Sequence, residues 1–345
     1  MNNGRFYRPR SLLLQWHITD RCNLRCKHCY QETNSLKELT FQDLLDVYRQ
    51  FQELLDFWNQ DETLPMTRGH ITVTGGEPFI RHDFMDLLEF FSAQRQRISY
   101  AVLTNGSFID AEMAHRLHDL TPTFVQVSID GTQATHDRIR GVGDFKRVIS
   151  AVKHLVRERV PTFISFTAHR ANFREFADVA NLGMRLRVDR VWADRFIPLG
   201  RGLESEYQVL NPDETREFFE IMYRARRKAK RSLFCRTEIA MHRALQFLVA
   251  GGIPHHCTAG DTLITVMPNG DLYPCRRMPI RAGNLVETPL IKLYYKSDLF
   301  CALRKRISEG CEGCFYSGLC RGGLRCLSYA LTGDPFTTDP GCWQL

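Results

Sequence analysis

Strand-like and helix-like segments alternate at a regular spacing over residues 12–198. Six segments rich in β-branched, aromatic and aliphatic residues are typical of strands, and amphipathic stretches of helical length lie between them. The predicted strands span residues 12–19, 70–76, 99–105, 124–130, 161–168 and 189–198. Strands joined by helices run parallel with right-handed crossovers. We therefore expect an α/β fold that begins with a partial (β/α)6 TIM-like barrel, with its site at the carboxyl ends of the strands.

The clearest predicted helix covers residues 40–58, with the sequence TFQDLLDVYRQFQELLDFW. Thr40 and Asp43 form a start that resembles a capping box. Apolar side chains then recur every three or four residues and indicate a face that packs on the core: Leu44, Val47, Phe51, Leu54, Leu55 and Trp58. Similar patterns predict helices within residues 83–94, 144–158 and 173–186.

The pattern changes after residue 198, and the change divides the chain into three parts. We predict a barrel domain at residues 1–205, a helical linker at 206–250 and a small cysteine-rich α+β domain at 251–345. The linker contains a helix that ends in a basic cluster: Arg224, Arg226, Arg227, Lys228, Lys230 and Arg231. Such a run is typical of a solvated face, and contact with an acidic peptide or partner is the alternative.

Composition excludes several classes of protein. The chain has 43% hydrophobic residues but no uninterrupted apolar run of membrane-spanning length, and its N-terminus does not resemble a signal peptide. We therefore expect a cytoplasmic protein that does not enter the membrane. The formal charge of +7 counts every cysteine as neutral. Cysteines bound to iron as thiolates would lower it to about +3, so the charge gives little reason to expect a nucleic-acid partner.

The twelve cysteines are unevenly distributed. Three lie at residues 22–29 and nine lie at residues 235–342. Because the cytosol keeps thiols reduced, we interpret them as metal ligands instead of disulfides. The stretch RCNLRCKHCY, residues 21–30, directly follows the first predicted strand. Its three thiolates would fill three of the four iron corners of a [4Fe-4S] cluster and leave one iron open. A zinc site completed by His28 is the alternative.

These motifs resemble the radical S-adenosylmethionine (radical SAM) superfamily. The resemblance rests on Cys22-x3-Cys26-x2-Cys29 followed by Tyr30, and on the GGEP sequence at 75–78. It extends through SIDG at 128–131 and HDRIRG at 136–141, so it covers about the first 200 residues. It implies an oxidoreductase in which electron transfer to the cluster cleaves S-adenosylmethionine, and the resulting 5′-deoxyadenosyl radical removes a hydrogen atom from a substrate.

The resemblance also implies roles for individual residues. Cys22, Cys26 and Cys29 would hold a [4Fe-4S] cluster whose open iron is chelated by the amino and carboxylate groups of S-adenosylmethionine. The remaining residues implied to lie around this cofactor are Tyr30, Gly75, Gly76, Glu77, Asn105, Ser128 and Asp130. Glycine at 75 and 76 would let the cofactor approach the backbone closely. For Asn105, Ser128 and Asp130, a role in a turn or a strand end is the alternative.

The C-terminal cysteines are similar to the SPASM extension, which houses auxiliary Fe–S clusters. The match covers residues 257–342. It implies a distal [4Fe-4S] cluster on Cys311, Cys314, Cys320 and Cys342. It also implies a proximal [4Fe-4S] or [2Fe-2S] cluster on Cys257, Cys275 and Cys326. A zinc ribbon built on Cys311 and Cys314 is the alternative.

The proximal ligand set departs from the family pattern. The family places a cysteine directly after two glycines, where this chain has Leu324, and Cys326 follows two residues later. The fourth ligand is either absent or drawn from Cys235, Cys301, His255 and His256.

Within this branch, the resemblance points first to maturation of a ribosomally synthesised peptide through a thioether or carbon–carbon crosslink or a related oxidation. Tetrapyrrole side-chain tailoring in a heme pathway and sulfatase-type protein maturation are alternatives. A non-catalytic Fe–S scaffold that binds peptides is a further one. The expected partners are a precursor peptide, a flavodoxin- or ferredoxin-type electron donor and a separate leader-peptide-binding protein. The last is expected because only 21 residues precede Cys22, and recognition of the leader by the barrel rim, with the basic cluster at residues 224–231, is the alternative.

Candidates for a catalytic acid or base are few. Asp194 and Arg195 lie on the sixth predicted strand, where the alternation of side chains places only one of them in the barrel interior. Asp130, at the end of the fourth predicted strand, is the third candidate.

Overall fold

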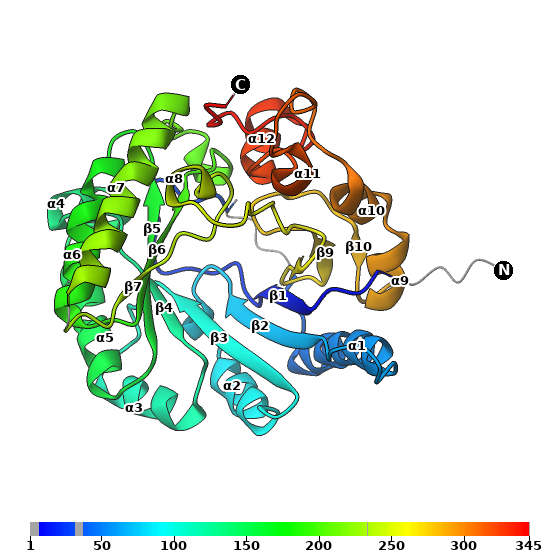
Figure 1. Cartoon of the computed structure of the whole chain (residues 1–345). Helices are drawn as coiled ribbons and strands as arrows, with labels where there is room; N and C mark the ends of the chain where they lie inside the picture. The colour runs from blue at the N-terminus through cyan, green and yellow to red at the C-terminus, as the bar shows by residue number, and fades with distance from the viewer. Residues whose placement is uncertain (1–6, 32–36, 233, 345) are drawn as a thin grey trace.

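A ten-stranded sheet forms the body of the molecule (Figure 1). The computed structural model describes residues 7–31, 37–232 and 234–344. The strand order is β10-β9-β8-β1-β2-β3-β4-β5-β6-β7. Strands β1 to β8 pair in parallel, and the small strands β9 and β10 pair antiparallel. The expected α/β class with a barrel-like parallel sheet is confirmed.

All six predicted strands are present. They are β1 (Ser11–His17), β2 (Arg68–Thr74), β3 (Ile98–Thr104), β4 (Val125–Ser128), β5 (Thr162–Ala168) and β6 (Arg190–Arg195). The strands pair in chain order, each with the next, as repeated βα units require. Their carboxyl ends therefore meet at one edge of the sheet.

Helices cover the outer face of this sheet (Figure 1). They are α1 (Phe41–Asn59), α2 (Phe84–Ala93), α3 (Ala111–Leu120), α4 (Gln133–Arg140), α5 (Asp144–Arg157), α6 (Phe176–Leu186) and α7 (Pro212–Arg231). Short 3-10 turns lie at Pro78–Ile80, Phe173–Glu175 and Gly200–Gly202.

The predicted capping box at the start of α1 is present. The Thr40 hydroxyl accepts a hydrogen bond from the Asp43 backbone at 3.2 Å, and the Asp43 carboxylate accepts one from the Thr40 backbone at 2.9 Å. The apolar stripe of α1 is buried against the core, as its spacing indicates.

Two further segments extend the sheet at its edges. β7 (Glu238–Ile239), within the predicted linker, pairs with β6. β8 (Leu263–Val266), from the C-terminal part, pairs in parallel with β1 and places Leu263 opposite Leu13. β9 (Asp271–Tyr273) and β10 (Gly283–Asn284) continue the sheet beyond β8.

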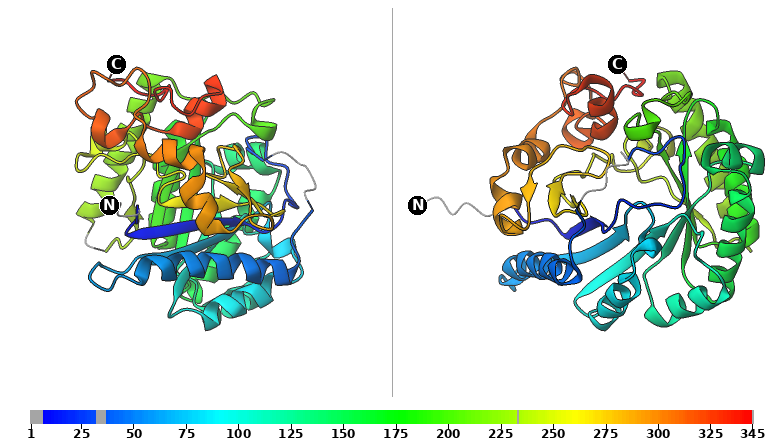
Figure 2. Two further views of the ribbon diagram at one scale, coloured as in Figure 1. Left: turned by 90° about the vertical axis from the view of Figure 1, so that its right-hand side faces the viewer. Right: turned by 180° about the vertical axis from the view of Figure 1, so that it is seen from behind.

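The C-terminal elements gather on the side of the sheet that α1 to α7 leave uncovered (Figure 2). They include α8 (Phe247–Ala250), α9 (Leu290–Lys296), α10 (Asp298–Lys305), α11 (Ser317–Cys320) and α12 (Arg325–Thr332). The α9 residue Tyr294 packs edge-on against Trp58 of α1, with ring centroids 5.2 Å apart. Among the described residues, no helix is both long and apolar enough to cross a membrane.

Candidate active site

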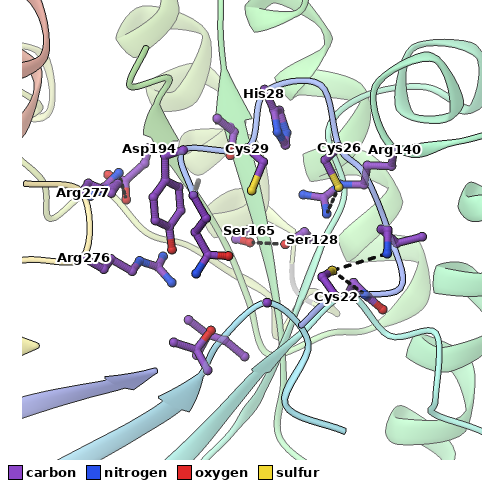
Figure 3. A pocket seen from close by; sticks show the side chains of 18 of the residues that line it. Cys22, Cys26, His28, Cys29, Ser128, Arg140, Ser165, Asp194, Arg276 and Arg277 are labelled. Atoms are coloured by element: carbon purple, nitrogen blue, oxygen red, sulfur yellow. Dashed lines mark hydrogen bonds and ion pairs between the residues drawn. The ribbon is translucent and has the colours of Figure 1, made fainter. Parts of the chain in front are cut away.

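A cavity of about 420 Å³ lies at the carboxyl ends of the barrel strands. One wall is the loop after β1, which carries the first three cysteines, and Arg276 and Arg277 of the C-terminal part reach in from another side (Figure 3). Ser128, Ser165 and Asp194 contribute from strands β4, β5 and β6. The site is therefore built jointly by the barrel and the C-terminal region.

Cys22, Cys26 and Cys29 all line this cavity. The Cys22 sulfur accepts a hydrogen bond from the Leu24 backbone at 3.4 Å, and the Arg140 guanidinium lies 3.7 Å from the Cys26 sulfur (Figure 3). Burial raises the pKa of Cys26 to about 11. A bound metal would hold this sulfur as a thiolate at neutral pH. Three such sulfurs on one cavity wall, with N–H donors beside them, fit an Fe–S cluster.

Gly75 and Gly76 let the loop after β2 lie directly against the loop after β1. The Gly76 backbone donates to the Thr19 carbonyl at 2.8 Å. A Cβ at Gly75 would lie 2.5 Å from the Thr19 carbonyl oxygen, and one at Gly76 would lie 2.3 Å from that of Arg21. Glycine is therefore required here because the two loops pack closely. A close approach by a cofactor would be a second reason for glycine at these positions.

Glu77 connects the strand-end loops from within the protein. Its fully buried carboxylate accepts hydrogen bonds from the Thr104 hydroxyl at 2.8 Å and the Asn105 backbone at 2.7 Å. The Asn105 side chain in turn donates to the Asn23 amide oxygen at 2.8 Å. Burial raises the pKa of Glu77 to about 7. Asn105 lines the cavity, whereas the Glu77 carboxylate supports it from behind.

Asp130 is fully buried and does not line the cavity. Its carboxylate accepts hydrogen bonds from Arg140 Nε at 2.6 Å and from the Thr167 backbone at 3.0 Å, and lies 2.9 Å from His28 Nε2. Burial opposes its ionisation, but Arg140 and His28 hold the pKa of Asp130 well below its usual range. Asp130 thus fixes Arg140 beside Cys26. The His28 ring faces the Asp130 carboxylate. In the zinc alternative, the metal would take the place of Asp130 as the partner of this ring.

Asp194 and Arg195 face different surroundings. The Asp194 carboxylate lines the cavity and forms an ion pair with Arg277 at 3.0 Å. The guanidinium of Arg195 is buried and pairs with Asp339 near the C-terminus at 2.8 Å. Of these two candidates, only Asp194 has its charged group in contact with a residue of the opposite cavity wall.

Ser128 and Tyr30, for which the family resemblance implies contacts with the cofactor, both line the cavity. Ser128 lines the cavity with its hydroxyl 3.3 Å from that of Ser165. The Tyr30 ring also lines the cavity, and the Arg276 guanidinium lies 5.6 Å from its centroid.

The proximal cysteines converge in one buried cluster. Cys257, Cys275 and Cys326 pack together, and the thiols of the last two are hydrogen-bonded to each other. That bond lowers the pKa of Cys275 and raises the pKa of Cys326, because one thiol donates its proton toward the other. The Arg277 backbone donates to the Cys275 sulfur at 3.5 Å. Three buried sulfurs that pack together, with a backbone N–H donor beside Cys275, fit an Fe–S site.

The distal cysteines surround a small separate cavity. Cys311, Cys314, Cys320 and Cys342 line it, together with Thr338 and Leu245. The Cys311 sulfur lies 3.2 Å from the Thr338 hydroxyl. No three His, Cys, Asp or Glu side chains among the described residues converge on a point that could hold a single metal ion. Four thiols around a void fit a polynuclear cluster.

Three candidates for the fourth proximal ligand have other partners. The Cys301 thiol donates to the Tyr295 carbonyl at 3.3 Å, and His256 Nε2 lies 3.1 Å from the Asp261 carboxylate. The Cys235 sulfur lies 3.9 Å from the Thr237 carbonyl. The ring of His255, the last candidate, lies 5.7 Å from that of His242.

Apart from Arg195, sequence reasoning assigned no role to the arginines of the site. Arg140 belongs to the HDRIRG motif, which indicates the family without giving this residue a role, and Arg276 and Arg277 directly follow Cys275. Arg201 lines the cavity from the 3-10 turn Gly200–Gly202. Motif membership pointed to Arg140, but no local pattern indicated that the other three share one cavity.

Comparison with known proteins places these motifs in a family. The radical SAM superfamily profile matches residues 16–183, and that of an iron-sulfur cluster-binding domain, SPASM, matches residues 257–315. The chain is similar to an AdoMet-dependent heme synthase of Methanosarcina barkeri, at 27% identity over 96% of this chain and 95% of that protein. It is also similar to the mycofactocin maturase MftC of Mycolicibacterium smegmatis, at 28% identity over 96% and 82%.

Solved structures show the same fold. AdoMet-bound anSMEcpe aligns with a TM-score of 0.76 at 19% identity, over 97% of this chain and 94% of that one. Streptococcus suis SuiB bound to S-adenosylmethionine aligns with a TM-score of 0.73 at 17% identity, over 96% and 77%. The chain therefore belongs to the radical SAM superfamily, as an enzyme that uses S-adenosylmethionine and Fe–S clusters and carries a C-terminal SPASM domain.

Proposed function

We propose that this enzyme matures a ribosomally synthesised peptide, forming a thioether or carbon–carbon crosslink or carrying out a related oxidation. The proposal is carried by the contact between the two halves of the site. Arg277 binds the Cys275 sulfur through its backbone and the cavity residue Asp194 through its guanidinium. The proximal cysteines therefore adjoin the cavity in which a substrate would react, an arrangement that favours electron transfer from the substrate to a cluster held there.

Cys22, Cys26 and Cys29 hold a [4Fe-4S] cluster in this proposal. Cys311, Cys314, Cys320 and Cys342 hold a distal [4Fe-4S] cluster, and Cys257, Cys275 and Cys326 hold a proximal [4Fe-4S] or [2Fe-2S] cluster. When bound, S-adenosylmethionine supplies a 5′-deoxyadenosyl radical, and a flavodoxin- or ferredoxin-type protein supplies the electron. The residues proposed to surround S-adenosylmethionine are Tyr30, Gly75, Gly76, Glu77, Asn105 and Ser128, with Asp130 acting through Arg140.

The chain's own residues orient and shield the reaction. Arg140 lies beside Cys26 and stabilises negative charge at that end of the cavity. Asp194 is proposed as the acceptor of a proton from the substrate. Burial opposes its ionisation, but Arg277 lowers the pKa of Asp194, so the carboxylate is present at neutral pH.

The size of the cavity favours a peptide. Its volume of about 420 Å³ lies in the lower part of the range of roughly 300–1,000 Å³ for pockets that enclose one small ligand. With the cofactor bound, the remaining space suits a single side chain or a chain end. The relatedness to MftC, a maturase, and the structure of SuiB bound to its precursor peptide support the same substrate class. A separate protein would bind the leader peptide.

Tetrapyrrole side-chain tailoring is the second candidate. The heme synthase of Methanosarcina barkeri matches over 95% of its own length, and Fe-coproporphyrin III synthase and pre-heme d1 synthase are also similar over most of their length. Here the edge of a macrocycle, with one of its side chains, would enter the cavity.

Anaerobic reconstitution with iron and sulfide tests the proposal. We expect about 10 to 12 irons per wild-type chain, and about four fewer in the C22A/C26A/C29A variant. Turnover with dithionite and the short peptide encoded beside the gene should yield a peptide that has lost two hydrogens, measured by mass spectrometry. An unchanged peptide together with conversion of iron coproporphyrin III would replace the proposal with the second candidate.

A further inference from the structure

Three further arginines line the cavity, and two of them lie on the side away from Cys22 and Cys26. Arg276 and Arg277 enter from the C-terminal part, and Figure 3 shows them across the cavity from Arg140. Arg201 joins them from the turn after β6. The Arg276 guanidinium lies 5.6 Å from the centroid of the Tyr30 ring, which also lines the cavity.

Most other arginines of the lining have a carboxylate partner. Arg140 pairs with Asp130, Arg195 pairs with Asp339, and Arg21 pairs with Glu38. These pairs are internal to the fold. They leave little capacity in those guanidinium groups for a ligand.

The group formed by Arg201, Arg276 and Arg277 is different. Within the described residues, Arg276 and Arg201 form no hydrogen bond or ion pair, and Arg277 pairs with Asp194 but leaves its Nε without a partner. Nε and Nη1 of Arg201 are likewise buried and unpartnered. A buried donor without an acceptor costs about 1–3 kcal/mol, so these positions favour a ligand that supplies acceptor atoms.

The chemistry of that ligand follows from the donors. Guanidinium groups present planar pairs of N–H donors that match the two oxygens of a carboxylate. Under the proposed function, the carboxylate of S-adenosylmethionine binds at the open iron, at the cysteine side of the cavity. Arg276 and Arg277 across the cavity, and the unpartnered donors of Arg201, are then available to the substrate.

We infer that Arg201, Arg276 and Arg277 bind a carboxylate of the substrate. This contact holds the reacting carbon, which lies close to that carboxylate in the substrate. The inference rests on the proposed function for the position of the cofactor. In a peptide, the carboxylate is the free C-terminus or an acidic side chain near the modified residue. In a tetrapyrrole, it is a propionate.

Paired probes on the reconstituted holoenzyme test the inference. One pair is the peptide encoded beside the gene with a free C-terminal carboxylate and the same peptide with a C-terminal amide and its acidic side chains as amides. The other pair is iron coproporphyrin III and its tetramethyl ester. Kd is measured by anaerobic equilibrium dialysis for wild type, R201Q, R276Q and R276K, with R185Q on exposed positions of α6 as the matched control.

We expect wild type to bind the acid form of one pair about 10- to 100-fold more tightly than its neutral form. R276Q and R201Q should each lose about that factor for the acid form and almost nothing for the neutral form, whereas R276K should retain part of the preference. R185Q should behave as wild type. A variant that binds both forms more weakly by one common factor has a structural defect, and such a result for both R201Q and R276Q would overturn the inference.

The outcomes separate this inference from the proposed function. Arginine-dependent acid preference in the coproporphyrin pair alone would support the inference and contradict the peptide substrate. Modification of the peptide without any acid preference in either pair would support the proposed function and overturn the inference.

Discussion

A single buried residue, Glu77, connects the loop after β2 with the loop after β3 through its carboxyl and with the cysteine loop through its backbone. Its oxygens accept hydrogen bonds from the side chain of Thr104 and the backbone of Asn105, and its own backbone N–H donates to the Arg21 carbonyl at 2.8 Å. The GGEP motif therefore stabilises the site through the side chain of Glu77 as well as through its backbone.

The titration of Glu77 gives a prediction at this scale. Its pKa is about 7 in the folded protein, against 4.5 for the free carboxyl, because of burial. The folded state therefore retains the proton over this range. The contribution of Glu77 to stability is largest below pH 4.5 and declines by about 3 kcal/mol as the pH rises through 7. E77Q removes the titrating group. The difference in unfolding free energy between the E77Q variant and wild type should therefore change by about 3 kcal/mol over the same pH range.

Thermal unfolding of the reconstituted proteins at pH 5 and pH 8, followed by circular dichroism, checks this. Parallel pH dependence in wild type and E77Q would show that Glu77 does not titrate in this range.

Among elements, the caps of α1 and α7 show how local sequence defines helix ends. Asn211 and Glu214 form a second capping box, in which the Asn211 side chain accepts from the Glu214 backbone at 2.8 Å. At the N-cap of α4, by contrast, the side chain of Thr132 makes no capping bond.

We predict that T40A and N211A each lower the free energy of unfolding by about 1 kcal/mol, because each exposes backbone N–H groups without an acceptor. T132A is the matched control and should change it by much less. Urea denaturation of the three variants measures the differences. An equal loss in T132A would mean that removal of a threonine or asparagine side chain lowers the free energy of unfolding whether or not that side chain forms a capping bond.

The same elements show what a sequence can and cannot predict. The six barrel strands and the capped helix α1 were predicted because their signals are periodic and local. The pairing of β8 with β1 was not, since four residues, LITV, carry no information about a partner in a distant part of the chain. The contact of Arg277 with Asp194 is likewise a product of that long-range packing.

At the scale of the whole molecule, Asp339 joins the C-terminal end to the barrel. Its buried carboxylate pairs with Arg195 of β6 and accepts hydrogen bonds from the Leu324 and Gly341 backbones, at 2.7 and 2.9 Å. Arg195 was considered as a catalytic group from sequence, and this pairing supports a structural role instead.

D339N should therefore lower the free energy of unfolding by about 3–5 kcal/mol, because it leaves the Arg195 charge buried without a counter-ion. E238Q is the matched control, since it breaks the exposed Arg190–Glu238 pair and should cost less than about 1 kcal/mol. Denaturation of the reconstituted holoenzymes, together with iron content, measures both effects. Equal, small losses in the two variants would contradict the anchoring role of Asp339.

The pairing of β8 with β1 also affects the order of events during translation. Of the described strands, β1 is synthesised before the others, but the strand that covers its outer edge is made only when residues 263–266 are synthesised. Until then β1 presents open backbone donors and acceptors, the kind of edge on which strands of other chains can align. Nascent and truncated chains should therefore depend on chaperones more than the finished protein does, and the cavity should acquire its complete wall only after most of the chain has emerged.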